Sequence, residues 1–167
     1  MYSLLVTLSL RVPLRNLSDE RWNTGLSALQ KVLKQKNPHE IVLALKSLRL
    51  FYRRVIENQR SELYLEYLHT IVDVVMSRLT EDAPAYAVKP YLKTLVLLHP
   101  FLPDNSLEVV QQLELLWKGA QSVEIKYWIV RLLAAMVVKE KHNDEIKRIC
   151  DRVILDTIVE MDVTLSY

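Results

Sequence analysis

Glycine and cysteine are scarce in this chain, and each shortage excludes a class of protein. Among the 167 residues there are two glycines, far apart in the sequence, and one cysteine, Cys150. Two isolated glycines cannot form a glycine-rich phosphate-binding loop, and β-sandwiches and barrels need many more glycine-containing turns. A single cysteine allows neither an internal disulfide bond nor a cysteine-based zinc site. Because a cysteine-poor chain fits a reducing compartment, we expect an intracellular protein, cytoplasmic or nuclear.

Long apolar runs without charge are lacking as well. No uncharged apolar stretch reaches about 18 residues, so the sequence predicts no membrane-spanning helix. The apolar first ten residues carry no basic group ahead of Arg11, which is unlike a signal peptide. Half of the residues are hydrophobic, a quarter are charged, and the formal net charge is +2. These proportions are typical of a soluble globular protein, and we expect one domain over residues 1–167.

Catalytic and metal-binding motifs are also missing from the sequence. The four histidines do not have the spacing of metal ligands. Glu66 and His69 match the Glu-x-x-His motif of di-iron proteins, but such a site needs two of these motifs and two further glutamates. His142 lies two helical turns from Cys150, too far for a nucleophile and its base. We therefore expect no enzyme activity, no cofactor and no bound metal.

Helix start signals, in contrast, recur along most of the chain. Asn37 can cap a helix in which Pro38 takes the first position and Glu40 completes a capping box. The sequence predicts helix starts near Ser18, Pro38, Ser61, Pro84, Asn105, Ser122 and Asn143. Pro90 falls within the fourth of these segments, so that helix either begins near Pro90 or bends there.

The predicted starts are regularly spaced. First helices of successive pairs begin near Ser18, Ser61 and Asn105, at intervals of 43 and 44 residues. A helix pair of about 40–47 residues is the repeat of HEAT and armadillo proteins. On this period and helical pattern, residues 18–158 resemble a HEAT/armadillo-type α-helical repeat domain. The resemblance implies a mainly α fold, a right-handed stack of about seven helices. The alternative is an irregular bundle of helices of similar length.

Two of the predicted helices, over residues 61–79 and 122–138, are apolar almost all round. Helices of this kind must be covered on several sides, so we place them in the middle of the stack, where either also has a face to offer a partner. The residues predicted for the core are Trp22, Leu68, Ile71, Trp128 and Leu132.

The two ends of the chain show a different pattern. Residues 1–12 and residues 159–167 alternate apolar and polar side chains, which is typical of a β-strand. The strand-pairing candidates at the C-terminal end are Val159, Met161, Val163, Leu165 and Tyr167. We expect these strands to pair with each other or with another chain. The alternative is a helical first segment and a frayed tail.

Basic residues are concentrated in the second helix of each predicted pair. Residues 38–60, 84–103 and 122–141 carry formal net charges of +3, +2 and +2, so the rest of the chain carries −5. Repeat proteins of this kind bind partners on an extended concave surface, and second helices usually form it. The candidate partner-binding residues are Lys46, Arg49, Arg53, Lys89, Lys93, Lys126 and Arg131. The alternative is scattered charge that keeps exposed faces solvated.

Together these patterns predict a non-enzymatic module for protein–protein interaction. It would act as a scaffold that binds a partner's peptide, helix or strand, or a second copy of the chain as a homo-oligomer. The alternative is an adaptor whose basic concave stripe binds nucleic acid or anionic membrane headgroups, as similar-looking VHS and ENTH trafficking domains do. Salt dependence separates the two, because phosphate contacts weaken steeply with salt and apolar contacts do not.

Overall fold

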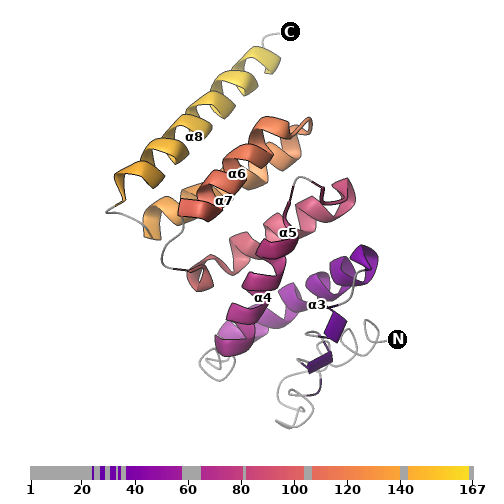
Figure 1. Ribbon diagram of the computed structural model, residues 1–167. Coiled ribbons are helices and arrows are strands. Elements are labelled where there is room, and N and C mark those ends of the chain that lie inside the picture. Colours follow the sequence, from indigo (N-terminus) through magenta and orange to yellow (C-terminus); the bar gives the residue numbers. More distant parts are fainter. Residues whose placement is uncertain are drawn as a thin grey trace.

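The computed structural model describes residues 24, 27–28, 31–32, 34, 37–57, 65–80, 82–103, 107–139 and 143–165. Over these residues the chain is mainly helical and has no strand, which confirms the predicted α class (Figure 1). The elements are α3 (Pro38–Glu57), α4 (Leu65–Arg78), α5 (Ala85–Leu97), the 3-10 helix η3 (His99–Phe101), α6 (Leu107–Gly119), α7 (Val123–Lys139) and α8 (Asp144–Leu165). The described residues between 24 and 34 are helical too, within the helix predicted from Ser18.

Asparagine side chains start two of the helices, as the sequence predicts. Asn37 Oδ1 accepts the backbone N–H of His39 at 3.1 Å, ahead of α3. Asn143 Oδ1 accepts the backbone N–H groups of Glu145 and Ile146, each at 3.2 Å, ahead of α8. The first turn of a helix leaves its N–H groups without backbone partners, and these amide oxygens supply them.

Proline marks the start of α5 but does not interrupt it later. Pro84 occupies the N-cap position without a side-chain cap, and the helix runs on through Pro90 to Leu97. The helix therefore does not begin at Pro90. Proline has no N–H to donate within the helix, but the Pro90 carbonyl accepts the Thr94 hydroxyl at 2.8 Å.

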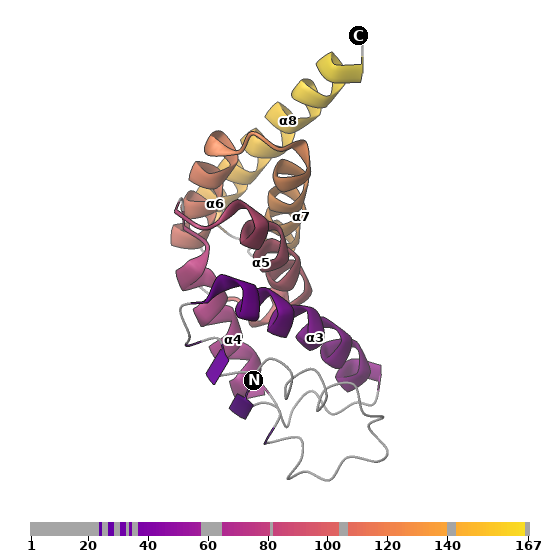
Figure 2. The ribbon, with the colours of Figure 1, turned by 90° about the vertical axis from the view of Figure 1, so that its right-hand side faces the viewer.

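Alternate helices stack on one another. α5 packs against α3 and α7, α4 packs against α5, and α6 packs against α7. In Figure 2, α4 and α6 lie to the left of α3, α5 and α7, so the chain passes back and forth between two layers. α8 packs against both α6 and α7, at the opposite end of the molecule from α3 (Figure 1).

One hydrophobic cluster runs through the described helices and fills the space between the two layers. Leu68, Ile71 and Leu132 are fully buried in it, as predicted. Trp128 is half-buried and packs against the cluster from outside. Trp22 lies outside the described residues. Among the helices described, none has both the length and the apolar character needed to span a membrane.

The predicted C-terminal strand is wrong. Residues 159–165 continue α8 as helix, and the last two residues lie outside the described part. Of the strand-pairing candidates, the structure makes Val159, Met161, Val163 and Leu165 helical, and Tyr167 is not described. Alternate residues of a helix do not share a face, so these side chains do not form one strand edge. The N-terminal strand predicted over residues 1–12 lies outside the described residues.

The physical reason for the error is that two periodicities overlap at this end. Ile154, Ile158, Met161 and Leu165 are apolar at helical spacing within the same segment that alternates. A helix that Asn143 has already started extends by one hydrogen bond per residue, whereas a lone strand needs a partner for every backbone group. Extension of α8 therefore satisfies the backbone locally.

Candidate partner-binding surfaces

Cationic side chains lie on aromatic rings where α5 meets α7. Lys93 Nζ is 4.8 Å from the centroid of the Trp128 ring. The Arg131 guanidinium lies 5.2 Å from the Trp128 ring and 5.8 Å from the Tyr127 ring. These are cation–π distances, at which the ring face attracts the charge. Lys93, Arg131, Tyr127 and Trp128 are hereafter the α5–α7 cationic cluster.

Lys89 joins the two helices beside this cluster. Its ammonium group pairs with the carboxylate of Glu124, which lies in the first turn of α7. Both side chains are more than a third exposed, and exposed pairs of this kind contribute little to stability. The pair neutralises one of the predicted basic residues, and Lys93 and Arg131 are left as the cations of the cluster.

Lys126 belongs to a different part of the surface. Its ammonium group is 2.6 Å from a carboxylate oxygen of Glu160 on α8 and 4.9 Å from the Trp117 ring on α6. It therefore connects α6, α7 and α8. Of the seven predicted partner-binding residues, the structure brings Lys89, Lys93 and Arg131 together and separates Lys126 from them.

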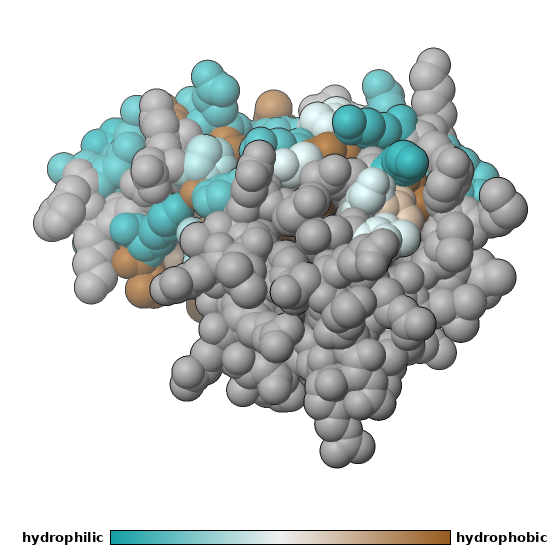
Figure 3. Space-filling view, turned by 90° about the horizontal axis from the view of Figure 1, so that it is seen from below, coloured by the Kyte–Doolittle hydropathy of each residue, from teal (hydrophilic) through white to brown (hydrophobic). Residues whose placement is uncertain are grey.

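The remaining predicted cations lie on α3. Lys46 is exposed and Arg49 is half-buried, one turn apart on the helix that packs beside α5. Arg53 lies further along α3, and its side chain is outside the described part of the structure. Figure 3 shows, among the described residues in view from below, a band where hydrophilic residues alternate with hydrophobic ones.

Exposed apolar residues on α7 and α8 form a further surface, and the sequence pattern indicates only part of it. Residues 122–138 are apolar almost all round, and α7 does leave apolar residues in solvent. Its exposed face carries Val123, Tyr127, Ala134 and Val138 at helical spacing. α8 leaves Leu155, Ile158, Val159 and Met161 exposed. The period-two pattern hid part of the second group, because it assigned Val159 and Met161 to a strand.

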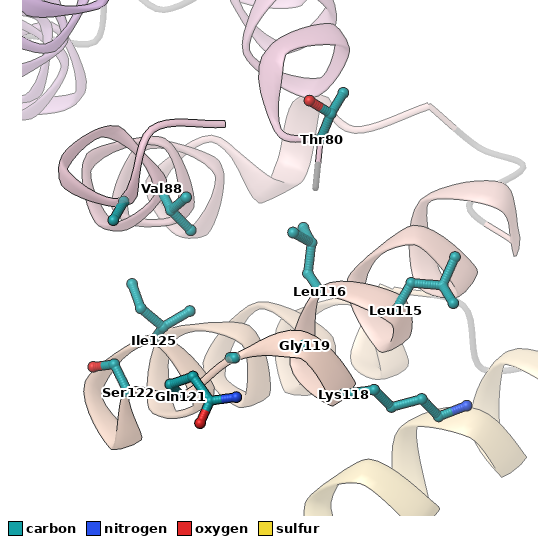
Figure 4. A pocket seen from close by; sticks show the side chains of 11 residues that line it. Thr80, Val88, Leu115, Leu116, Lys118, Gly119, Gln121, Ser122 and Ile125 are labelled. Carbon is teal, nitrogen blue, oxygen red and sulfur yellow. The ribbon is translucent and has the colours of Figure 1, made fainter. Parts of the chain in front are cut away.

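An open cavity of about 670 Å³ lies between α5, the end of α6 and the loop that leads into α7 (Figure 4). Val88, Leu116 and Ile125 point into it, and Thr80 and Ser122 place hydroxyl groups at its edge. Lys118 is the one ionisable group among the lining residues, and it pairs with Glu114 at 3.0 Å. The lining therefore suits an apolar side chain more than acid–base chemistry.

The cysteine is a core residue. Cys150 is a free, fully buried thiol on the inner face of α8. Burial, with a smaller effect of the neighbouring Asp151 charge, raises its pKa to about 11. Because the thiolate is the reactive form, this thiol is unsuited to nucleophilic or ligand chemistry at neutral pH. No group of three or more His, Cys, Asp or Glu side chains able to hold a metal occurs among the described residues.

The chain was compared with known families, curated proteins and solved structures. No family model, no curated protein and no solved structure matches it.

Proposed function

We propose that this chain is a non-enzymatic, intracellular protein-interaction module of the HEAT/armadillo type. In this proposal the helices form successive pairs, and the layer of α3, α5 and α7 presents the binding surface. The partner contributes an acidic peptide segment, which binds at the α5–α7 cationic cluster.

The stacking of alternate helices supports the repeat architecture. α5 lies against α3 and α7, and each of α4 and α6 lies against the helix that follows it. An array of helix pairs gives this pattern, because each pair contacts mainly its neighbours. In an irregular bundle, α5 would not be expected to lie against α3 in the same way as α7 lies against α5.

The α5–α7 cationic cluster is the observation that carries the proposed binding. Cation–π contacts hold Lys93 and Arg131 in place while leaving their charges at the surface, where Tyr127 is 44% exposed. A preordered cation loses less conformational entropy when it binds a carboxylate than a free side chain does. An arginine beside an exposed tyrosine and a half-buried tryptophan is also a composition typical of binding hot spots.

The pairing of the other cations favours a peptide over a nucleic acid or a membrane. A phosphate backbone is bound by many cations in a row, and its affinity grows with their number. Here Lys89 and Lys126 already pair with Glu124 and Glu160. Two cations beside aromatic rings match a short acidic segment with few carboxylates.

The test is a salt titration of three probes against the wild-type chain and against the double variant Lys93→Glu/Arg131→Glu. The probes are a fluorescent acidic peptide with aromatic residues, a single-stranded oligonucleotide, and phosphatidylserine vesicles. We expect the peptide to bind most tightly, with a shallow salt dependence, and the double variant to weaken it about tenfold or more. Tighter binding of the oligonucleotide or the vesicles, with a steep salt dependence, would instead support the adaptor alternative.

A matched control separates position from net charge. Lys147 and Arg148 are exposed cations on α8, away from the cluster. The variant Lys147→Glu/Arg148→Glu has the same net charge as the cluster variant. It should bind the acidic peptide nearly as the wild-type chain does, and an equal loss in both variants would contradict a specific site.

A further inference from the structure

The open cavity between α5, the end of α6 and the start of α7 is large enough for a small molecule. Its volume is about 670 Å³, within the range of about 300–1,000 Å³ that ligand sites occupy. A cavity of about 150 Å³ already holds one benzene ring. One apolar side chain of a partner would therefore leave much of this space empty, whereas a molecule with the bulk of several rings fits it.

Small residues keep the cavity open. The turn from α6 into α7 contributes Gly119, Ala120 and Ser122 to the lining, and the first turn of α5 contributes Ala85. None of these residues has a side chain long enough to reach across the space. At Gly119, an added Cβ would meet no atom within 4 Å. The space is therefore a consequence of the residues that the sequence places at these helix ends.

The walls of the cavity are apolar and come from three helices. Val88 of α5, Leu116 of α6 and Ile125 of α7 point into it (Figure 4). Val88 is buried, and Leu116 and Ile125 are half-buried. An occupant that covers these side chains removes apolar surface from water, which favours binding. Because α7 packs against both α5 and α6, the walls are held in place before a ligand binds.

Among the described residues, no charged group is directed into the cavity. Lys118 is the ionisable residue of the lining, and Figure 4 shows its side chain directed away from Val88 and Ile125, towards the yellow ribbon of α8. The Lys118 ammonium group pairs with the Glu114 carboxylate at 3.0 Å. A charged ligand would lose its hydration in the cavity without gaining an opposite charge there. The lining therefore favours a neutral ligand.

Three polar side chains at the edge of the cavity can hold one end of such a ligand. They are the hydroxyl groups of Thr80 and Ser122 and the amide of Gln121. All three are exposed, and none of them forms a hydrogen bond with the part of the chain that the structure describes. Hydroxyl and amide groups both donate and accept hydrogen bonds. A few polar groups of this kind beside apolar walls orient a ligand in its site.

We propose that this cavity binds a neutral, largely apolar small molecule, whose hydrogen-bonding group lies at the edge beside Thr80, Gln121 and Ser122. None of the residues of the α5–α7 cationic cluster belongs to the lining. Ligand binding in the cavity and peptide binding at the cluster are therefore separate functions of the chain.

Two fluorescent probes with the same ring skeleton test the preference for a neutral ligand. N-phenylnaphthylamine is neutral, and anilinonaphthalene sulfonate adds a negative charge to the same rings. In a titration with the full chain, the neutral probe should saturate a single site and bind about tenfold or more tighter than the sulfonate. Failure of the neutral probe to bind, or tighter binding of the sulfonate, overturns the proposal.

A larger side chain inside the cavity should block the neutral probe. Leu116→Trp enlarges a side chain that points into the space, and it should weaken binding about tenfold or more. Ala134→Trp enlarges an exposed residue of α7 outside the lining and is the matched control. Circular dichroism checks that both variants are folded. Unchanged binding in the first variant, or an equal loss in the second, contradicts a site in the cavity.

Gly119→Phe keeps the site testable if Leu116→Trp does not fold. Because a Cβ at Gly119 has open space around it, a side chain there does not displace core residues. This variant should also weaken binding of the neutral probe about tenfold. Wild-type affinity in the folded Gly119→Phe variant overturns the proposal.

Further variants exclude binding of the probe elsewhere on the chain. Leu155→Ser/Ile158→Ser removes exposed apolar side chains of α8 and should leave the affinity for the neutral probe unchanged. Lys93→Glu/Arg131→Glu should also leave it unchanged, and the unlabelled acidic peptide should not displace the probe. A loss in either variant, or displacement by the peptide, would assign the probe to α8 or to the peptide site and overturn a separate small-molecule site. If the peptide binds and the neutral probe does not, the cavity is not a ligand site and the proposed function stands.

Discussion

α5 and α8 are both rich in apolar residues, but α5 leaves one large apolar side chain, Tyr86, strongly exposed, whereas α8 leaves four exposed among its described residues. α5 lies between α3 and α7 and also against α4. Over half of its residues are buried, including Thr94, whose hydroxyl donates within the helix. α8 buries one face and leaves apolar residues on the others in solvent. The apolar residues of α5 therefore belong mostly to the core, whereas those on the outer side of α8 remain a surface.

The largest expected effect comes from truncating one leucine in each of the two helices. Leu92 of α5 is fully buried, so Leu92→Ala should lower the free energy of unfolding by about 2–5 kcal/mol through lost burial and the cavity left behind. Leu155 of α8 is 61% exposed, so Leu155→Ala should cost less than about 0.5 kcal/mol. Urea unfolding measures both values, and similar losses would show that α8 is covered in the free chain.

Burial of Cys150 on α8 should also make the free energy of unfolding depend on pH in alkaline solution. The pKa of Cys150 is raised from 9.0 to about 11 in the folded chain, because burial disfavours the thiolate. The stabilisation by the protonated thiol is complete below about pH 9 and is lost as the pH rises towards 11, at up to about 1.4 kcal/mol per pH unit. The stability difference between wild type and Cys150→Ala, measured by urea unfolding, should narrow over this range. A constant difference would place the thiol in water.

A hydrogen bond ties the middle of α8 to α6. Trp117 donates its indole N–H to the Thr157 hydroxyl at 2.9 Å, and that hydroxyl donates to the Val153 carbonyl at 2.7 Å. Thr157→Val keeps the shape but leaves a buried N–H without an acceptor, which should cost about 1–3 kcal/mol in thermal or urea unfolding. Thr157→Ser keeps the hydroxyl and is the control. A smaller loss in Thr157→Val than in Thr157→Ser would contradict a role for the bond.

The smallest expected effect concerns how the two helices begin. α8 is capped by Asn143, whereas α5 has no side-chain cap at Pro84. Asn143→Ala should therefore cost about 1 kcal/mol in urea unfolding. Asn143→Asp keeps the acceptor oxygen and places a negative charge at the positive end of the helix, so it should be close to wild type. Equal losses in both variants would mean that the side chain is not the cap.

Helix starts could be predicted because capping is local chemistry. Asn37, Pro84 and Asn143 act within four residues of themselves, and the structure places α3, α5 and α8 directly after them. The core positions of Leu68, Ile71 and Leu132 followed from helical spacing in the same way. These features need no knowledge of the rest of the fold.

Charge partners and helix length could not be predicted, because both depend on segments distant in the sequence. Glu124 and Glu160 lie 35 and 34 residues after the lysines with which they pair, Lys89 and Lys126. The sequence shows that each lysine is positively charged, but it does not show which lysine has a neighbouring carboxylate in the fold. Likewise, the alternating residues after Ile158 satisfy both a strand and a helix pattern, and the helix already begun at Asn143 decided between them.

The stacking order has a mechanical consequence. In the described residues α5 packs against both α3 and α7, whereas α3 and α7 do not pack extensively on each other. A pulling force applied between α3 and α8 is therefore transmitted through α5 and its two contact faces. Such an assembly responds as elastic elements joined in series, so every interface carries the same force. Each interface extends according to its own compliance, and the softest one yields first.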